Sequence, residues 1–443
     1  MIESLLVANR GEIARRIIRT ANRLGIRTVA VHSEADADLP FVREADEAVC
    51  VGPANPAQSY RNTEAILAAA KSTGAQAIHP GYGFLSENAD FARTVEANGL
   101  IWVGPPAEAI TAMGDKINAR NLMAEAGVPV APGTHDPAAT VEAAIAAATT
   151  IGYPVMVKAA AGGGGMGMAV AADEDALIKE YDKVRAFAER MFGDAAVLIE
   201  RYFPRVRHVE VQILGLADGR VIALSERECS VQRRNQKLVE EAPSPAVGPE
   251  LRERLLAAAV QAGEAVGYRN AGTVECLLDP ATGEFFFLEM NTRLQVEHPI
   301  TELIHGIDLV EEQLRIASGE PTTFEPGKTT GHAIELRINA EDPKRFLPGP
   351  GKVTTWVEPT GDGVRVDSGY TEGNTVTPFY DSLMAKLIVF GTDRDDAIAK
   401  ARTAVAGFQI AGPKNNLPFF AELLENDEFR SGDYDTGIVA RMR

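Results

Sequence analysis

Short apolar runs alternate with amphipathic stretches over the first quarter of the chain. The runs SLLVA, RTVAVHS, EAVCVG, QAIHPG and LIWVG predict strands, and EIARRIIRTANRLG, NTEAILAAAKSTG and NADFARTVEANG predict helices. The first helix shows the helical spacing most clearly, at Ile13, Ile17, Ala21 and Leu24. Alternation of this kind predicts an α/β domain with a parallel sheet, which we end near Ala112.

The pattern changes after this point, where hairpins are mixed with helices. YPVMVKAAAGGGGMGMAVA predicts a strand, a glycine loop and a strand, while RHVEVQILGLADGRVIALSE and GTVECLLDPATGEFFFLEMN each predict a hairpin. This mixture is typical of an α+β domain, here over residues 113–330, which ends in a linker at residues 318–331. Short strands with Gly and Pro turns and the helix DAIAKARTAVAGF follow over residues 331–443, as a third, mixed α+β domain. A length of 443 residues agrees with about three domains.

Polar residues occupy every second position directly after the last buried strand of the central region. The apolar run FFFL is followed by Glu289, Asn291, Arg293, Gln295 and Glu297. In an extended chain alternate side chains share a face, so the row predicts one polar face of acids, amides and a guanidinium group. The alternative is a strand that leaves the core for solvent.

The same hairpin predicts two facing carboxylates. If its five-residue loop pairs Asp279 with Phe285, then Glu275 lies directly opposite Glu289. Like charges in that position are destabilising, so the pair requires a cation or a shared proton. With phosphates nearby Mg²⁺ is the natural cation, and Asn291 continues the same face. The alternative is a solvent-facing acidic pair in a shifted register.

Four consecutive glycines, at residues 162–165, lie between two predicted strands. Together with Gly167 they match G-x-G-x-x-G, but a dinucleotide site of that type requires a helix after the loop, and MAVA predicts a strand. A flap whose backbone N–H groups approach phosphate fits better, with Lys158 as a point charge beside it. A floppy hairpin tip is the alternative. No G-x-x-x-x-G-K-[ST] motif occurs, which excludes a P-loop.

The formal net charge of −18 argues against a nucleic-acid or anionic-membrane binder. Arg233, Arg234 and Lys237 nevertheless cluster in the sequence, either to bind an anionic substrate or to face Glu240 and Glu241. The three cysteines have no metal-like spacing, which predicts a reducing, cytoplasmic setting. No signal peptide and no apolar run of ~20 residues occurs, so we expect no membrane span.

Together these segments resemble the biotin carboxylase family of the ATP-grasp superfamily, over nearly the whole chain. The resemblance rests on LLVANRGEIARRI, AIHPGYGFLSEN, MGDK, the glycine flap, RHVEVQ, SVQRRNQKLVEEAPSP, EMNTRLQVEHPITE and RINAEDP. It implies a Rossmann-like domain over residues 1–112, an ATP-grasp domain over residues 113–330 with a mobile lid at about 131–203, and a C-terminal α+β domain over residues 331–443.

The resemblance also implies the reaction and its participants. The family carboxylates biotin with ATP and bicarbonate, through carboxyphosphate, as the first half-reaction of an acyl-CoA carboxylase. ATP and Mg²⁺ or Mn²⁺ would be required. Biotin would be a substrate on a separate biotin carboxyl carrier protein, because the chain contains no Met-Lys dipeptide of a biotinylation site. A separate carboxyltransferase and a homodimer are implied as well.

The resemblance assigns the site residues by role. As catalytic residues it gives a base, Glu297, an enolate-stabilising Arg337, and two bicarbonate cations, Arg293 and Lys237. Bicarbonate would also contact Gln295 and the main chain of Val296. The metal ligands would be Glu275, Glu289 and Asn291. The ATP contacts would be Lys116, Lys158, Gly163, Gly164, Gly165, Gly167, Glu200, Phe203, His208, Gln232, Asn235 and Leu277.

Two positions depart from the family pattern. The flap usually carries Lys or Arg where this chain has Met166, and many members have His where it has Asn235. Two other functions fit parts of the sequence. Another ATP-grasp carboxylate–amine ligase would lack QVEHP with RINAEDP, and a non-catalytic nucleotide sensor would not require Glu297.

Overall fold

The computed structural model describes residues 1–160, 166–324 and 327–443. The first domain is a five-stranded parallel sheet in the order β3-β2-β1-β4-β5. Its strands are β1 (Ser4–Val7), β2 (Arg27–Ser33), β3 (Glu47–Gly52), β4 (Ala77–His79) and β5 (Ile101–Trp102). Its main helices are α1 (Gly11–Arg23), α3 (Thr63–Thr73) and α4 (Ala89–Ala97). All five predicted strands and all three predicted helices are present.

Both faces of this sheet are covered, which explains why its strands are continuous apolar runs. Leu6 and Ile78 pack with residues of α3 and α4 in one cluster. Leu5 and Val7 belong to another cluster, together with Ile13 of α1. Two short helices, α2 (Pro40–Glu44) and α5 (Ala107–Gly114), complete the domain.

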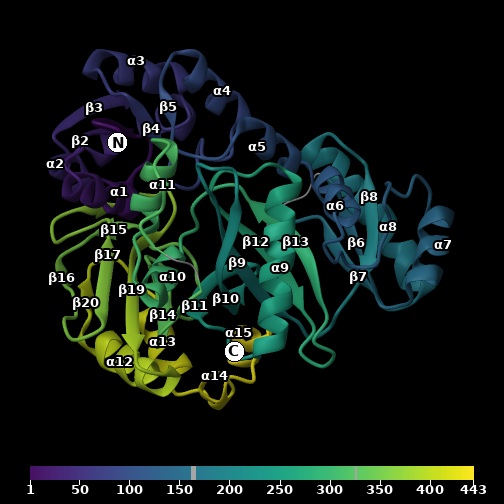
Figure 1. Ribbon diagram of the computed structural model, residues 1–443. Coiled ribbons are helices and arrows are strands. Elements are labelled where there is room, and N and C mark those ends of the chain that lie inside the picture. The colour runs from purple at the N-terminus through teal and green to yellow at the C-terminus, as the bar shows by residue number, and fades with distance from the viewer. Residues whose placement is uncertain (161–165, 325–326) are drawn as a thin grey trace.

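A separate lobe lies to one side of the molecule (Figure 1). It contains the antiparallel sheet β7-β6-β8, formed by β6 (Val155–Ala159), β7 (Met168–Ala171) and β8 (Val197–Arg201). Two helices, α7 (Val141–Ile151) and α8 (Glu174–Phe192), share an apolar core with it, and α6 (Lys116–Glu125) precedes it. The predicted Gly163, Gly164 and Gly165 lie outside the described residues. The mobility predicted for this lobe stays a prediction.

An eight-stranded sheet occupies the centre, in the order β13-β12-β9-β10-β11-β14-β19-β17 (Figure 1). The strands are β9 (Arg207–Gly215), β10 (Val221–Arg233), β11 (Gln236–Ala242), β12 (Asn270–Leu278), β13 (Phe285–Asn291), β14 (His332–Asn339), β17 (Val364–Ser368) and β19 (Leu383–Gly391). The helices around it are α9 (Pro249–Ala265), α10 (His298–His305), α11 (Leu309–Ala317) and α12 (Arg394–Gly407). Because β11 pairs with β14, the sheet runs across the predicted domain boundary at residue 330.

Short elements complete the C-terminal region. They are β15 (Gly351–Lys352), β16 (Thr355–Val357), β18 (Thr375–Val376), β20 (Gln409–Ala411), α13 (Leu417–Leu423), α14 (Asp427–Ser431) and α15 (Ile438–Arg441). Among the described residues, no helix is long and apolar enough for a membrane span.

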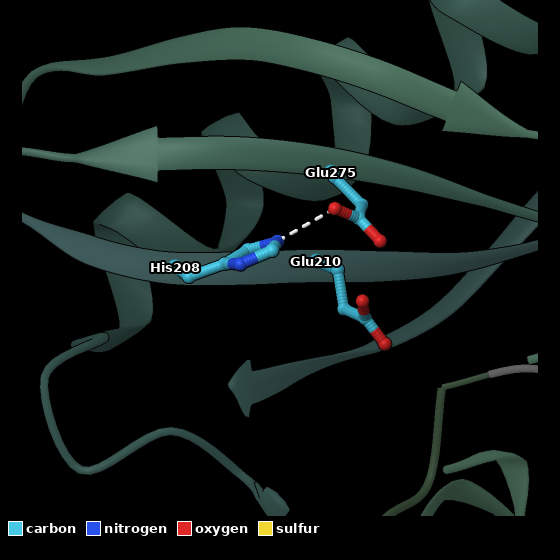
Figure 2. A group of neighbouring side chains, drawn as sticks. All are labelled: His208, Glu210 and Glu275. Atoms are coloured by element: carbon cyan, nitrogen blue, oxygen red, sulfur yellow. Dashed lines mark ion pairs between the residues drawn. The ribbon is translucent and has the colours of Figure 1, made fainter. Parts of the chain in front are cut away.

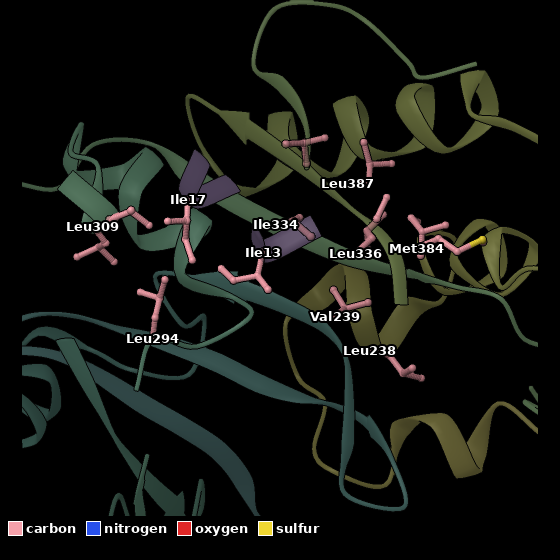
Figure 3. Packing of buried hydrophobic residues seen from close by; sticks show 14 of the residues in the cluster. Ile13, Ile17, Leu238, Val239, Leu294, Leu309, Ile334, Leu336, Met384 and Leu387 are labelled. Carbon is pink, nitrogen blue, oxygen red and sulfur yellow. The ribbon is translucent and has the colours of Figure 1, made fainter. Parts of the chain in front are cut away.

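One apolar cluster joins the N-terminal helix α1 to the central sheet (Figure 3). Ile13 and Ile17 of α1 belong to the same cluster as Leu309 of α11 and Leu336 of β14. All four side chains are fully buried or nearly so. The N-terminal domain is therefore packed directly against the sheet that carries the polar row.

The second hairpin corrects one detail of its predicted register. Glu275 lies opposite Glu289, as predicted, but Phe285 pairs with Leu278 and not with Asp279. The register shifts between Glu275 and Cys276, so Leu288 is an extra, bulged residue of β13. The predicted pairing at the turn was therefore wrong, and the bulge restores the facing carboxylates.

The polar row is also not one extended strand. Strand β13 ends at Asn291, and helix α10 begins at His298. Glu297 precedes that helix with φ −81° and ψ 10°, outside the extended region. The side chains of the polar row are therefore brought to one site by the turn between β13 and α10, and not by the alternation of a single extended strand.

Candidate active site

A cavity of about 730 Å³ lies between the N-terminal domain and the central sheet. It is lined by ten of the predicted site residues: His208, Asn235, Lys237, Glu275, Glu289, Asn291, Arg293, Gln295, Val296 and Arg337. Residues from the N-terminal domain, among them Glu12 and Tyr82, line it from the other side. Four of the five residues of the polar row and two of the three residues of the basic cluster, which are separate in the sequence, thus face one space; Glu297 and Arg233 are not in its lining.

Lys237 of β11 is the centre of the charge network. Its Nζ lies 2.5 Å from Glu210 Oε2, 2.8 Å from Glu275 Oε1 and 2.7 Å from Glu297 Oε1. Burial lowers the pKa of Lys237, but its three carboxylate neighbours outweigh that effect and raise the pKa well above its usual value. Lys237 is therefore a permanent cation in the wall of the cavity.

Glu297 lies between two cations and is fully buried. Lys237 holds its Oε1, and Arg337 Nη2 lies 3.0 Å from its Oε2. Burial raises the pKa of Glu297, but Lys237 and Arg337 outweigh burial and hold the pKa well below 4.5. The side chain is thus an ionised carboxylate whose basicity is suppressed as long as both cations stay on it.

Arg293 is held in place by three side-chain oxygens. Its Nε donates to Glu87 Oε2 at 3.0 Å, and its Nη atoms donate to Gln295 Oε1 and Asn291 Oδ1, each at 2.9 Å. The sequence pattern did not identify Glu87. The signal it offers is weak, a single acid in the loop FLSENAD of the N-terminal domain.

The two predicted metal acids differ in their surroundings. Glu275 Oε1 accepts hydrogen bonds from Asn291 at 2.8 Å and Gln295 at 3.0 Å, and its Oε2 lies 2.7 Å from His208 Nε2. Burial first, and then Glu275, raise the pKa of Glu289. A divalent cation would relieve this repulsion, and carboxylate oxygens suit Mg²⁺ or Mn²⁺, so the donor set fits the group.

The structure also places another acid beside this pair. His208, Glu210 and Glu275 bring one ligand atom each within 4.8 Å of one another. Figure 2 shows these three side chains together, with the ion pair between His208 and Glu275 as a dashed line. Glu210 was missed, although RHVEVQ puts His208 and Glu210 on the same face of a strand, and that alternation could have identified it.

Among the described residues, seven predicted ATP residues are not part of the cavity lining: Lys116, Lys158, Gly167, Glu200, Phe203, Gln232 and Leu277. The predicted base Glu297 also lies behind the lining and not in it. Several of the ATP residues still lie close to one another. Lys158 Nζ donates to Glu200 Oε2 at 2.6 Å, and Phe203 stacks on Phe286 with ring centroids 5.0 Å apart. Burial lowers the pKa of Lys116, while Glu289 raises it.

Three residues near the flap and in the β10–β11 turn can be understood from their backbone conformation or exposure. Gly167 has φ +70°, and a Cβ there would lie 3.0 Å from the Cβ of Ala159. Asn235 has φ +65°, a left-handed conformation that Asn tolerates better than most residues. Met166 is 51% exposed and therefore is not an apolar anchor in this conformation.

Lys386 is a further residue that the sequence pattern did not identify. It is fully buried, and its Nζ donates to the carbonyl oxygen of Val296 at 2.9 Å and lies 3.2 Å from Glu12 Oε2. A lysine inside the apolar run LMAKLIVF was the available signal, because buried lysines are rare without a partner.

The antiparallel central sheet, the small lobe and the carboxylate–lysine site define an ATP-grasp enzyme, and the comparisons with known proteins agree. Residues 1–110 match the family model "Biotin carboxylase, N-terminal domain". Residues 115–324 match "Carbamoyl-phosphate synthase L chain, ATP binding domain", and residues 335–441 match "Biotin carboxylase C-terminal domain".

Relatives that align with this chain over nearly their whole length point to the same family. The "Biotin carboxylase" of Pseudomonas aeruginosa is 51% identical over 98% of this chain and 96% of that protein. The "Biotin carboxylase 2" of Bacillus subtilis is 50% identical over 99% of this chain and 99% of that protein. A crystal structure of a biotin carboxylase–β,γ-ATP complex from Campylobacter jejuni has a TM-score of 0.95 at 44% identity, and covers 100% of this chain and 99% of that chain. The chain belongs to the biotin carboxylase family.

Proposed function

We propose that this chain carboxylates biotin on a biotin carboxyl carrier protein, with ATP and bicarbonate as co-substrates. The observation that carries this proposal is the buried Glu297 carboxylate between Lys237 and Arg337. Two cations at the cavity wall with a carboxylate base directly behind them are what deprotonation of bicarbonate beside a phosphate requires. A related biotin carboxylase domain, from Hydrogenobacter thermophilus 2-oxoglutarate carboxylase, has been solved with MgADP and bicarbonate.

The first step exploits the suppressed basicity of Glu297. When bicarbonate enters, Lys237 and Arg337 turn toward the new anion and release part of their hold on the carboxylate. Burial then dominates and raises the pKa of Glu297, so the carboxylate becomes a stronger base where a proton must be removed. Arg293 and Lys237 offset the charge of the resulting carbonate.

Carbonate then attacks the γ-phosphate of ATP, which gives carboxyphosphate and ADP. Lys116 and Lys158 would contact the phosphates. A metal ion bound by Glu275 and Glu289 would neutralise part of the phosphate charge. Carboxyphosphate breaks down to CO₂ and phosphate, and the phosphate accepts the N1 proton of biotin. Arg337 stabilises the enolate oxygen of biotin, whose N1 attacks CO₂.

The decisive experiment measures ADP release with bicarbonate and free biotin added separately and together. We expect ADP release to require bicarbonate and to rise further with biotin. ADP release that does not depend on bicarbonate but requires an added carboxylate and amine would instead identify a different ATP-grasp ligase. Nucleotide binding without any release would identify a sensor.

We further propose that the chain works as a homodimer in the cytoplasm, beside a separate carrier protein and a separate carboxyltransferase. Support comes from the related structure described as a biotin carboxylase domain dimer, and from Cys50, Cys229 and Cys276, which are all free thiols. Light scattering of the purified chain should give twice the 47.4 kDa chain mass. Mass spectrometry of the native chain should show no biotinyl-lysine.

A further inference from the structure

Two glutamates beneath Arg337 are not used by the reaction above. Glu240 of β11 and Glu335 of β14 lie directly opposite each other in the antiparallel ladder, and both are fully buried. Two ionised carboxylates in such a position repel each other, and burial strengthens the repulsion. The pair therefore requires either a cation between the carboxylates or a proton on one of them.

The hydrogen bonds of the pair leave three oxygens without a partner. Glu240 Oε1 accepts from Arg337 Nε at 2.7 Å. Within the described part of the chain, no hydrogen-bond partner reaches Glu240 Oε2 or either carboxylate oxygen of Glu335. Buried polar atoms are normally paired, so three orphaned oxygens on facing residues require an explanation.

Among residues 1–160, 166–324 and 327–443, no side-chain cation is left over to fill this gap. The charged groups that act on the pair are Arg337, Lys237, Glu297 and Lys386. Each of the three cations is already engaged: Arg337 with Glu240 and Glu297, Lys237 with its own carboxylates, and Lys386 with Val296 and Glu12. A single proton is the remaining solution, because a protonated Glu335 can donate to the free oxygen of Glu240.

The titration behaviour agrees with this geometry. Burial raises the pKa of Glu240 to about 7, although Arg337 acts in the opposite direction. Burial also raises the pKa of Glu335 well above its usual value, and Lys386 only partly opposes it. Of the two, Glu240 ionises more readily, because Arg337 bonds it directly.

We propose that Glu240 and Glu335 hold one proton between them, and that Glu240 is thereby a positioning residue for Arg337. The ionised Glu240 holds the guanidinium from the side of the sheet, because its Oε1 lies 2.7 Å from Nε and 2.5 Å from Nη2 of Arg337. The same Nη2 also lies 3.0 Å from Glu297 Oε2, so Glu240 sets where Arg337 meets the base. The proton on Glu335 prevents a second negative charge from pulling the guanidinium away from the substrate. The link to catalysis rests on the proposed function, whereas the shared proton does not.

The shared proton can be detected without any activity measurement. Infrared spectra in D₂O report the C=O band of a protonated carboxyl group. We expect Glu335→Gln to lose one such band relative to the wild type at pH 7, and Glu240→Gln to lose one as well. Glu264→Gln, an exposed residue of α9, serves as the control and should lose none. An unchanged band in Glu335→Gln overturns the proposal.

The kinetic test separates positioning from a purely structural role. Glu335→Gln still offers an N–H to Glu240, so its biotin-dependent kcat should stay within about threefold of the wild type. Glu335→Leu offers no donor, and its biotin-dependent kcat should fall about tenfold or more, with the ATP KM changed less than about threefold. Equal losses in all parameters, or no loss in Glu335→Leu, overturn the positioning role. If Glu335→Leu does not fold, the biotin-dependent kcat values of Glu335→Gln and Glu240→Gln are compared instead. A higher kcat in Glu335→Gln supports the positioning role, and equal values overturn it.

These results are distinguishable from failure of the proposed function. If the wild type shows no bicarbonate-dependent ADP release, the proposed function is wrong, yet the infrared bands still decide the shared proton. If ADP release is normal and the band is unchanged, only the shared proton is wrong.

Discussion

Replacement of Glu297 by alanine tests the chemistry most directly. The carboxylate is fully buried, and its hydrogen bonds go to Lys237 and Arg337. Neither Lys116 nor Lys158 contacts it, so its loss should not reach the proposed phosphate contacts. We therefore expect bicarbonate-dependent ADP release to fall by about 10²–10⁴-fold, the usual contribution of a general base.

The structure also sets how much stability the substitution should remove. Breaking a buried ion pair typically costs about 3–5 kcal/mol when it leaves a charge uncompensated. Here Lys237 keeps Glu210 and Glu275, and Arg337 keeps Glu240. We therefore expect the smaller loss of about 1–3 kcal/mol that accompanies a lost buried hydrogen-bond partner. The variant should remain folded, which makes its kinetics interpretable.

The assay follows ADP release at saturating ATP with and without bicarbonate, and measures ATP affinity separately by calorimetry. Glu264→Ala, which removes an exposed carboxylate of α9, is the matched control and should behave as the wild type. Retention of more than about a tenth of the bicarbonate-dependent rate would refute the base role. Loss of ATP affinity together with activity would show that Glu297 supports the nucleotide site instead.

Four further substitutions probe other parts of the site and fold. Glu289→Gln should abolish metal-dependent turnover, and full activity at saturating ATP would contradict the metal assignment. Lys386→Met removes the donor to the Val296 carbonyl, so the bicarbonate KM should rise about tenfold while the ATP KM stays constant, and a change in the ATP KM alone would count against it. Glu241→Gln should cost about 3 kcal/mol at pH 7, because burial raises the pKa of Glu241 but hydrogen bonds and nearby cations hold it at about 2, against the usual 4.5. Since the folded-state pKa is depressed, that stability is present above pH 4.5 and should vanish as the pH falls toward 2; a difference that persists in denaturant melts at low pH would contradict the assignment. Met166→Lys should lower the apparent ATP KM by no more than about fivefold, since the position is half-exposed, and weaker ATP binding would show that the methionine packs on the closed flap.

The sequence predicted the N-terminal sheet well because local signals there agree with the tertiary structure. Each strand is an apolar run, and helices α3 and α4 have caps that the sequence displays, Asn62 and Asn88, whose side chains accept backbone N–H groups. The pairing of β11 with β14 could not be read in this way. It joins residues about 95 positions apart, such as Glu240 and Glu335, and no periodicity within either segment specifies the partner strand.

The site residues also divide into those with a local sequence signal and those placed by long-range contacts. The polar row is visible because it stands in a short pattern with one strand period, whereas His208 was assigned only by the family resemblance. Glu87, Lys386 and Glu335 are isolated acids or bases in segments that otherwise pack in the core or a loop. Their roles come from partners in distant strands, so only the folded structure reveals them.

The facing carboxylates of β12 and β13 were predicted correctly from a turn that was paired incorrectly. Counting from the true pairing of Leu278 with Phe285, a regular ladder would place Leu288 opposite Glu275. The bulge at Leu288 shifts the register by one residue and brings Glu289 to that position. Since facing carboxylates are unfavourable in a bare ladder, the bulge maintains an arrangement that the strand pairing alone would avoid. The bulge at Leu288 is the strongest reason in the fold itself to regard Glu275 and Glu289 as a cation site. It creates a repulsion between two carboxylates that a bound divalent cation would relieve.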